Sequence, residues 1–141
     1  MSGQAYLKIN EKEWFVSLAV ASWELEQGLG GLPDLEAGTG MLFDLGFAQT
    51  IHVTTVPMLF PLDIAFLSAD LKVTEIYQNV EPGYLVTSTQ PARYFIEVNV
   101  GDLTGIELGN QVSLEILPFQ DVPVESAWES AMFSFMGFTL L

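Results

Sequence analysis

The spacing of turn residues is the feature that most constrains the fold of this chain. Segments rich in β-branched and aromatic residues recur between turn signals about every ten residues, a pattern typical of an antiparallel β domain. Ser22 can cap a short helix that Gly28 can end. We therefore expect a mainly β fold with one short helix: a compact antiparallel barrel-like or sandwich domain of about seven strands. The predicted strands span residues 5–10, 14–21, 40–47, 50–56, 62–68, 72–77, 93–100 and 111–117.

The length of 141 residues suits a single domain. Residues 14–117 are interpreted as one β domain, preceded by an N-terminal arm or edge strand over 1–13. Pro118 and Pro123 then flank an extended link, and a hydrophobic C-terminal extension completes residues 118–141.

Charge and composition exclude several classes of function. Four basic residues stand against eighteen acids, for a formal net charge of -14. Such a surface repels phosphate backbones and anionic lipids, so neither nucleic acid nor a membrane surface is an expected partner. The absence of cysteine excludes disulfides, thiolate catalysis and zinc–cysteine sites. No apolar run is long enough to span a membrane, and no secretory signal is visible, so we expect a cytoplasmic location or a place within a larger assembly.

An acid inside the most apolar run raises the question of a site. The segment MLFPLDIAFLSADLKV at 58–73 holds Asp63 between Leu62 and Ile64. A buried carboxylate is costly unless it is hydrogen-bonded or paired. Asp63 is therefore either a general base or ligand in a pocket, or a structural carboxylate that accepts backbone N–H groups where Pro61 bends the chain. We favour the structural interpretation.

Three residues form the candidate ligand site: Met58, Asp63 and Glu97. Glu97 lies on a strand that alternates well, on the face opposite Ile96 and Val98, where it is expected to meet solvent. A carboxylate pair with Asp63 would permit acid–base chemistry, although nothing in the sequence marks a substrate groove. The single histidine, His52, fits a strand better than a metal site, since metals need several ligands at characteristic spacing. We expect no metal and no cofactor.

The C-terminal extension is the candidate contact for a partner. It ends in AWESAMFSFMGFTLL, too short to span a membrane. Two interpretations stand: a terminal element that packs on its own domain, and an apolar peptide that docks on another subunit. Exposed, it would be an aggregation hazard. The candidate contact residues are Trp128, Met132, Phe133, Phe135 and Phe138.

Three segments together resemble one family. They are GMLFDL at 40–45, the segment at 58–73, and ARYFIEVNVGDLTGIELGNQV at 92–112, while VASWELEQGL at 20–29 is similar to the family's short helix. The chain thus resembles the prokaryotic family known as domain of unknown function 192, over about residues 14–117. The resemblance implies a compact, mostly β domain and no established activity. The chain departs from the family's pattern at Gly30 and Asn110.

The sequence is compatible with three functions. The first is a non-catalytic binding or assembly domain whose C-terminal extension contacts a protein partner or another copy of the chain. The second is a small-molecule-binding protein or weak hydrolase that uses Asp63 and Glu97. The third is a structural subunit of a larger viral or surface assembly.

Overall fold

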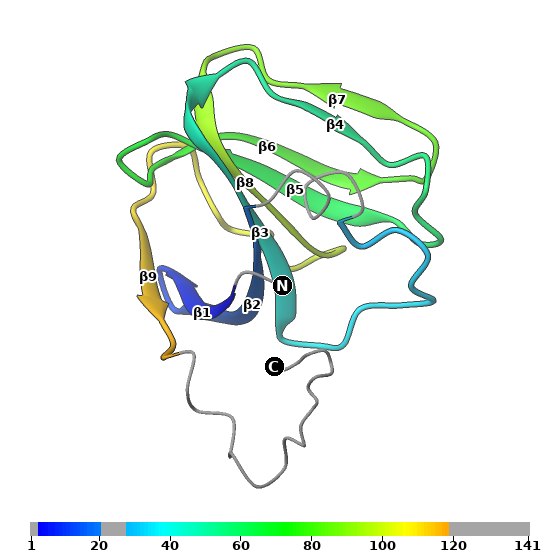
Figure 1. Ribbon diagram of the computed structural model, residues 1–141, viewed down its shortest axis with the longest axis horizontal. Coiled ribbons are helices and arrows are strands. Elements are labelled where there is room, and N and C mark those ends of the chain that lie inside the picture. Colours follow the sequence, from blue (N-terminus) through cyan, green and yellow to red (C-terminus); the bar gives the residue numbers. More distant parts are fainter. Residues whose placement is uncertain (1–2, 21–27, 119–141) are drawn as a thin grey trace, which may run out of the picture.

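The described part of the chain is built entirely from strands, turns and loops. A computed structural model describes residues 3–20 and 28–118 (Figure 1). The mainly β prediction is confirmed, whereas the predicted short helix falls largely on residues 21–27, outside the described residues. The strands are β1 (Gly3–Ile9), β2 (Lys12–Ala19), β3 (Thr39–Gln49), β4 (His52–Thr54), β5 (Leu62–Leu67), β6 (Val73–Val80), β7 (Leu85–Thr87), β8 (Ala92–Asn99) and β9 (Val112–Ile116).

The strands form one large sheet and one small one. The large sheet has the order β6-β5-β8-β3-β2-β1-β9, and the small sheet is the antiparallel pair β4-β7. Strands β2 and β3 are parallel, while the other neighbours are antiparallel. The large sheet curls until Lys72, just before β6, bridges Gln111, just before β9. It does not close into a barrel, and the architecture is sandwich-like.

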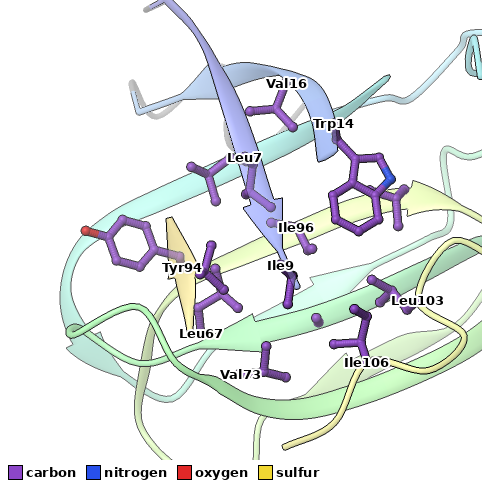
Figure 2. Packing of buried hydrophobic residues seen from close by; sticks show 14 of the residues in the cluster. Leu7, Ile9, Trp14, Val16, Leu67, Val73, Tyr94, Ile96, Leu103 and Ile106 are labelled. Atoms are coloured by element: carbon purple, nitrogen blue, oxygen red, sulfur yellow. The ribbon is translucent and has the colours of Figure 1, made fainter. Parts of the chain in front are cut away.

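Two hydrophobic cores lie on the two faces of the central strands. The first core fills the inside of the curl, where Leu7 of β1, Trp14 of β2 and Ile96 of β8 meet the loop residue Leu103 (Figure 2). The second core lies on the other face, under the small sheet, and includes Phe43 of β3. The central strands β5 and β8 are therefore covered on both sides.

This double covering changes how the central strands must be interpreted from sequence. Every residue of β5 is buried, so its burial does not alternate, and the strand is apolar except for Asp63. The alternation of β8 places Ile96 and Val98 in the first core, but it does not place the other face in solvent.

Two strand predictions are corrected. Strand β1 was predicted as an edge strand or arm, but it lies between β2 and β9 in the sheet. Strand β7, which follows the Pro82-Gly83 turn, was missed because it has only three residues, and β propensity is weak evidence over so short a segment.

The close approach of β3 to β8 depends on a glycine. Gly40 pairs with Val98, and a Cβ at position 40 would lie 2.8 Å from the carbonyl oxygen of Glu97 and 2.8 Å from Val98 Cγ1. We expect Gly40→Ala to lower the free energy of unfolding by about 1–3 kcal/mol, since the backbone of β8 must move to admit the methyl group. Urea denaturation should show a lower midpoint with an unchanged slope. An unchanged midpoint would show that the two strands separate without cost.

Candidate functional site

The carboxylate of Asp63 is fully buried and engaged by the main chain. Its Oδ1 accepts the N–H of Asn79 at 2.9 Å, and its Oδ2 accepts the N–H groups of Gly101 at 3.0 Å and Leu103 at 3.2 Å. The side chain is 0 % exposed. Three main-chain donors satisfy this acid, so it joins the end of β6 to the loop between β8 and β9.

A β-bulge explains why an acceptor is needed at this position. In the β5–β6 ladder Leu62 pairs with Val80 and Ile64 pairs with Tyr77, so two residues of β6 lie opposite Asp63 alone. A bulge leaves backbone groups outside the ladder. Asn79, at a left-handed φ of 53°, directs its N–H to the Asp63 carboxylate. The amides that Asp63 accepts thus belong to this bulge and to the loop after β8, and not to the bend at Pro61.

Glu75 is a second buried acid with the same use. Its two oxygens accept the N–H of Thr89 at 3.1 and 2.9 Å, and Oε2 also accepts the N–H of Gln90 at 3.1 Å. The Tyr77 hydroxyl donates to Oε1 at 2.8 Å, and this contact raises the pKa of Tyr77 above its usual value. Glu75 therefore fixes the loop between β7 and β8 to strand β6.

Glu97 differs from both of these acids. Its side chain is 3 % exposed, and its Oε1 has no hydrogen-bond partner among residues 3–20 and 28–118. A Cβ on Gly28 would lie 3.8 Å from that oxygen, and the stacked rings of Phe43 and Phe95 lie on the same face of the sheet. Burial raises the pKa of Glu97 from 4.5 to about 8, because a charged carboxylate there loses its water. The side chain therefore carries a proton at neutral pH, and the expectation that it faces solvent is wrong.

The strand register separates the two candidate carboxylates. Asp63 pairs with Val98, whose side chain lies in the first core, whereas Glu97 pairs with Ile64, whose side chain lies in the second. Residues directly opposite on neighbouring strands point to the same face, so Asp63 and Glu97 project from opposite faces of the sheet. Met58 is buried in the second core, on the side of Glu97. The structure does not bring Asp63 and Glu97 together.

The remaining candidates are placed as follows. His52 is exposed on β4, where its Nδ1 lies 3.0 Å from Thr87 Oγ1 of β7. Within the described ranges, no group of three or more His, Cys, Asp or Glu side chains is arranged to hold a metal ion. The same ranges contain no helix long and apolar enough to cross a bilayer. The candidate partner residues Trp128, Met132, Phe133, Phe135 and Phe138 lie outside the described residues.

An open groove lies between β6 and β7. It has a volume of about 420 Å³ and is lined by residues 77–81 and 84–87. One end is fixed by the buried Thr55, whose Oγ1 donates to the carbonyl of Glu81 and accepts the N–H of Tyr84, both at 2.8 Å. Tyr84 and Leu85, which line the groove, are 59 % and 66 % exposed. Val56 and Leu59, in the segment after β4, are 68 % and 64 % exposed.

Sequence reasoning missed Glu75, Thr55 and this groove. Glu75 and Tyr77 lie two residues apart in a strand, so they share one face. The sequence does not tell whether that face is buried or exposed to solvent. Thr55 gives no local signal, because its partners lie 26 and 29 residues away in the chain. The groove forms because β6 and β7, although consecutive in the chain, belong to different sheets. No local sequence pattern predicts this arrangement.

The fold and these contacts define a sandwich-like β domain whose buried acids hold loops in place. The profile of domain of unknown function 192, described as an uncharacterised ACR, matches residues 5–114. The chain belongs to this family, and the match begins earlier than the resemblance over residues 14–117 suggested.

Two solved structures share the fold. One is a proposed transcription regulator from Sinorhizobium meliloti 1021, at 26 % identity and a TM-score of 0.73, covering 79 % of this chain and 92 % of that one. The other is a protein of unknown function from Novosphingobium aromaticivorans DSM 12444, at 24 % identity and a TM-score of 0.70, covering 78 % and 83 %. No curated protein matches the chain significantly.

Replacement of Asp63 tests its structural role. In Asp63→Asn one acceptor oxygen becomes an amide donor, which faces the N–H of Asn79 or those of Gly101 and Leu103. We expect a loss of about 1–3 kcal/mol in unfolding free energy, because partly or fully buried N–H groups lose their acceptor. Amide hydrogen exchange should also accelerate at these positions. Asp34→Asn makes the same chemical change at an exposed residue and should leave both quantities unchanged.

The raised pKa of Glu97 predicts a dependence of stability on pH. Between about pH 4.5 and 8 the folded chain keeps the Glu97 proton and the unfolded chain releases it. Its contribution to stability is therefore fully present below pH 4.5 and falls by about 1.4 kcal/mol per pH unit until pH 8.

We expect Glu97→Gln to remove this slope. The variant should match the parent near pH 4.5 and unfold at a higher temperature than the parent near pH 9. Thermal unfolding measured across this range checks the difference, with Glu115→Gln as the exposed control. A difference in unfolding temperature between parent and Glu97→Gln that stays constant across this pH range would show that Glu97 has the same pKa in the folded and unfolded chains. Glu97 would then be ionised in the folded chain at neutral pH.

Proposed function

We propose that this chain is a non-catalytic binding or assembly domain whose C-terminal extension, residues 118–141, contacts another copy or a partner protein. The observation that carries the proposal is a set of exposed apolar side chains in the segment that follows β4 and at the start of β7. Val56, Leu59, Tyr84 and Leu85 are each more than half exposed. Single exposed hydrophobic residues are ordinary, whereas a group of them is characteristic of an interaction surface.

The local hydrogen bonds support one rigid surface. Thr55 lies between Thr54 and Val56, and its N–H donates to the carbonyl of Tyr84 at 2.8 Å. Thr54 pairs with Leu85 in the β4–β7 ladder. These bonds hold the segment around Val56 against the segment around Tyr84 before any partner arrives, and a preformed surface loses less entropy on binding.

The use of the buried acids supports a non-catalytic role. The carboxylates of Asp63 and Glu75 already accept backbone N–H groups, so neither is free to accept a proton from a substrate. Glu97 projects from the opposite face of the sheet from Asp63, so these two acids do not form a carboxylate pair.

The composition of the extension supports a contact between proteins. Residues 127–141 contain one charged side chain, Glu129, in a chain whose net charge is -14. Strong like charge keeps two copies apart, and an uncharged apolar segment is the kind of surface that can still associate. The same charge opposes direct contact with DNA, so the similarity to a proposed transcription regulator from Sinorhizobium meliloti does not change the proposal.

Removal of the extension tests this proposal. We expect the chain of residues 1–141 to have the mass of an oligomer in light scattering, and the chain of residues 1–118 to have the mass of a monomer. The shorter chain should keep its β-sheet circular dichroism, since β9 is already paired with β1 before residue 118. Monomers from both chains would contradict the proposal. A lower unfolding temperature without a change in mass would instead show that the extension packs on its own domain.

A further inference from the structure

We infer that the groove between β6 and β7 receives a short strand from within residues 130–141 of a second copy. This inference rests on the proposed function and adds the place and form of the contact. Among residues 3–20 and 28–118, strand β6 ends the large sheet, and β7 pairs only with β4 in the small one. The two strands are consecutive in the chain, joined by the turn at 81–84, yet they do not pair with each other.

The groove offers two strand edges to an extended peptide. An edge strand carries a row of backbone N–H and C=O groups without a strand partner, which is the template for strand addition. The groove is lined by residues 77–81 on the β6 side and 84–87 on the β7 side. Apart from the Lys72–Gln111 bridge before its start, β6 has no strand on its outer side among the described residues.

Hydrogen bonds from buried side chains fix the backbone on both sides of the groove. On the β6 side, Asp63 accepts the N–H of Asn79. At the turn, Thr55 bonds to Glu81 and Tyr84. The groove is therefore preformed. A strand that binds there becomes ordered, but the domain does not need to rearrange.

Residues 130–141, SAMFSFMGFTLL, fit this groove by charge and by propensity. They contain no charged side chain and no proline, so nothing prevents an extended, hydrogen-bonded conformation. Phenylalanine at 133, 135 and 138 favours strands. Among the lining residues only Glu81 is charged, and Tyr84 and Leu85 offer exposed apolar area for aromatic side chains.

The position of β9 favours a second copy over the same chain. Leu117 donates its N–H to the carbonyl of Gln4 at 3.0 Å, so the chain is anchored there. Figure 1 shows the end of β9 on the opposite side of the domain from β7. The linking residues 118–129 reach about 40 Å at full extension, close to the full width of a domain of this size. A return to the same groove would need this link taut around the surface, whereas a second copy placed beside β9 receives the segment with slack.

Such a contact joins two different surfaces of the same chain. The donor contributes its C-terminal segment and the acceptor its groove, so every subunit can do both. Contacts of this head-to-tail type produce rings when the rotation closes and open chains when it does not.

Substitution of one exposed groove residue tests the inference. Leu85→Asp places a charge on the apolar wall, and we expect it to weaken self-association by about tenfold or more. Leu108→Asp makes the same change at a residue of matching exposure, 65 % against 66 %, outside the groove, and should assemble as the parent does. Light scattering across a concentration series measures both, and circular dichroism confirms that each variant is folded.

A mixing experiment tests the direction of the contact. The Leu85→Asp chain keeps its C-terminal segment but has a blocked groove, and the chain of residues 1–118 has an open groove but no segment. At a concentration where the parent assembles and Leu85→Asp no longer does, neither chain should assemble alone, and mixed together they should form a one-to-one complex. If the full chain assembles, residues 1–118 do not, and Leu85→Asp assembles unchanged, the groove is not the acceptor although the proposed function stands. If the full chain is monomeric, the proposed function itself fails.

Discussion

The three hydrogen bonds to the buried carboxylate of Asp63 are the constraint on which the rest of the structure depends. They join the bulge in β6 to the loop that leads from β8 to β9. The bulge sets the course of β6 beside the groove, and the loop carries the chain to β9, where the large sheet curls back on itself. An aliphatic residue at this position would fill the space but would leave three N–H groups without their acceptor, of which that of Leu103 is buried and those of Asn79 and Gly101 are partly buried; a buried N–H group without an acceptor costs about 1–3 kcal/mol.

Three buried acids show that environment, and not residue type, decides what a carboxylate does. Asp63 and Glu75 accept several backbone N–H groups and hold loops. Glu97 lies on an apolar face beside the aromatic stack, and its raised pKa follows from desolvation. A protonated carboxyl group is a hydrogen-bond donor as well as an acceptor, so Glu97 acts in the core as a polar but uncharged side chain at neutral pH.

Local patterns predicted most of the fold and the role of Asp63, and they failed where long-range packing decides the outcome. The apolar run around Asp63 and the nearby proline indicated a structural acceptor, although the amides come from the β6 bulge and from residues 101 and 103. The alternation of β8 correctly assigned Ile96 to a core. It placed Glu97 in solvent because a period of two distinguishes two faces without revealing whether both are covered. The small sheet β4-β7 covers the second face, and its strand β7 is too short to be predicted.

The formal net charge of -14 opposes aggregation at the outer edges of β6 and β7, which have no paired strand among the described residues. An exposed edge pairs readily with other chains, and natural proteins commonly protect it with charge. In this chain the acids are spread along the sequence, so two copies repel each other as they approach. Residues 130–141 carry no charged side chain and therefore feel little of this repulsion at close range. Repulsion between the domains, together with a segment that has no charged side chain, would favour the proposed insertion of that segment into the groove over sheet-to-sheet association of whole domains.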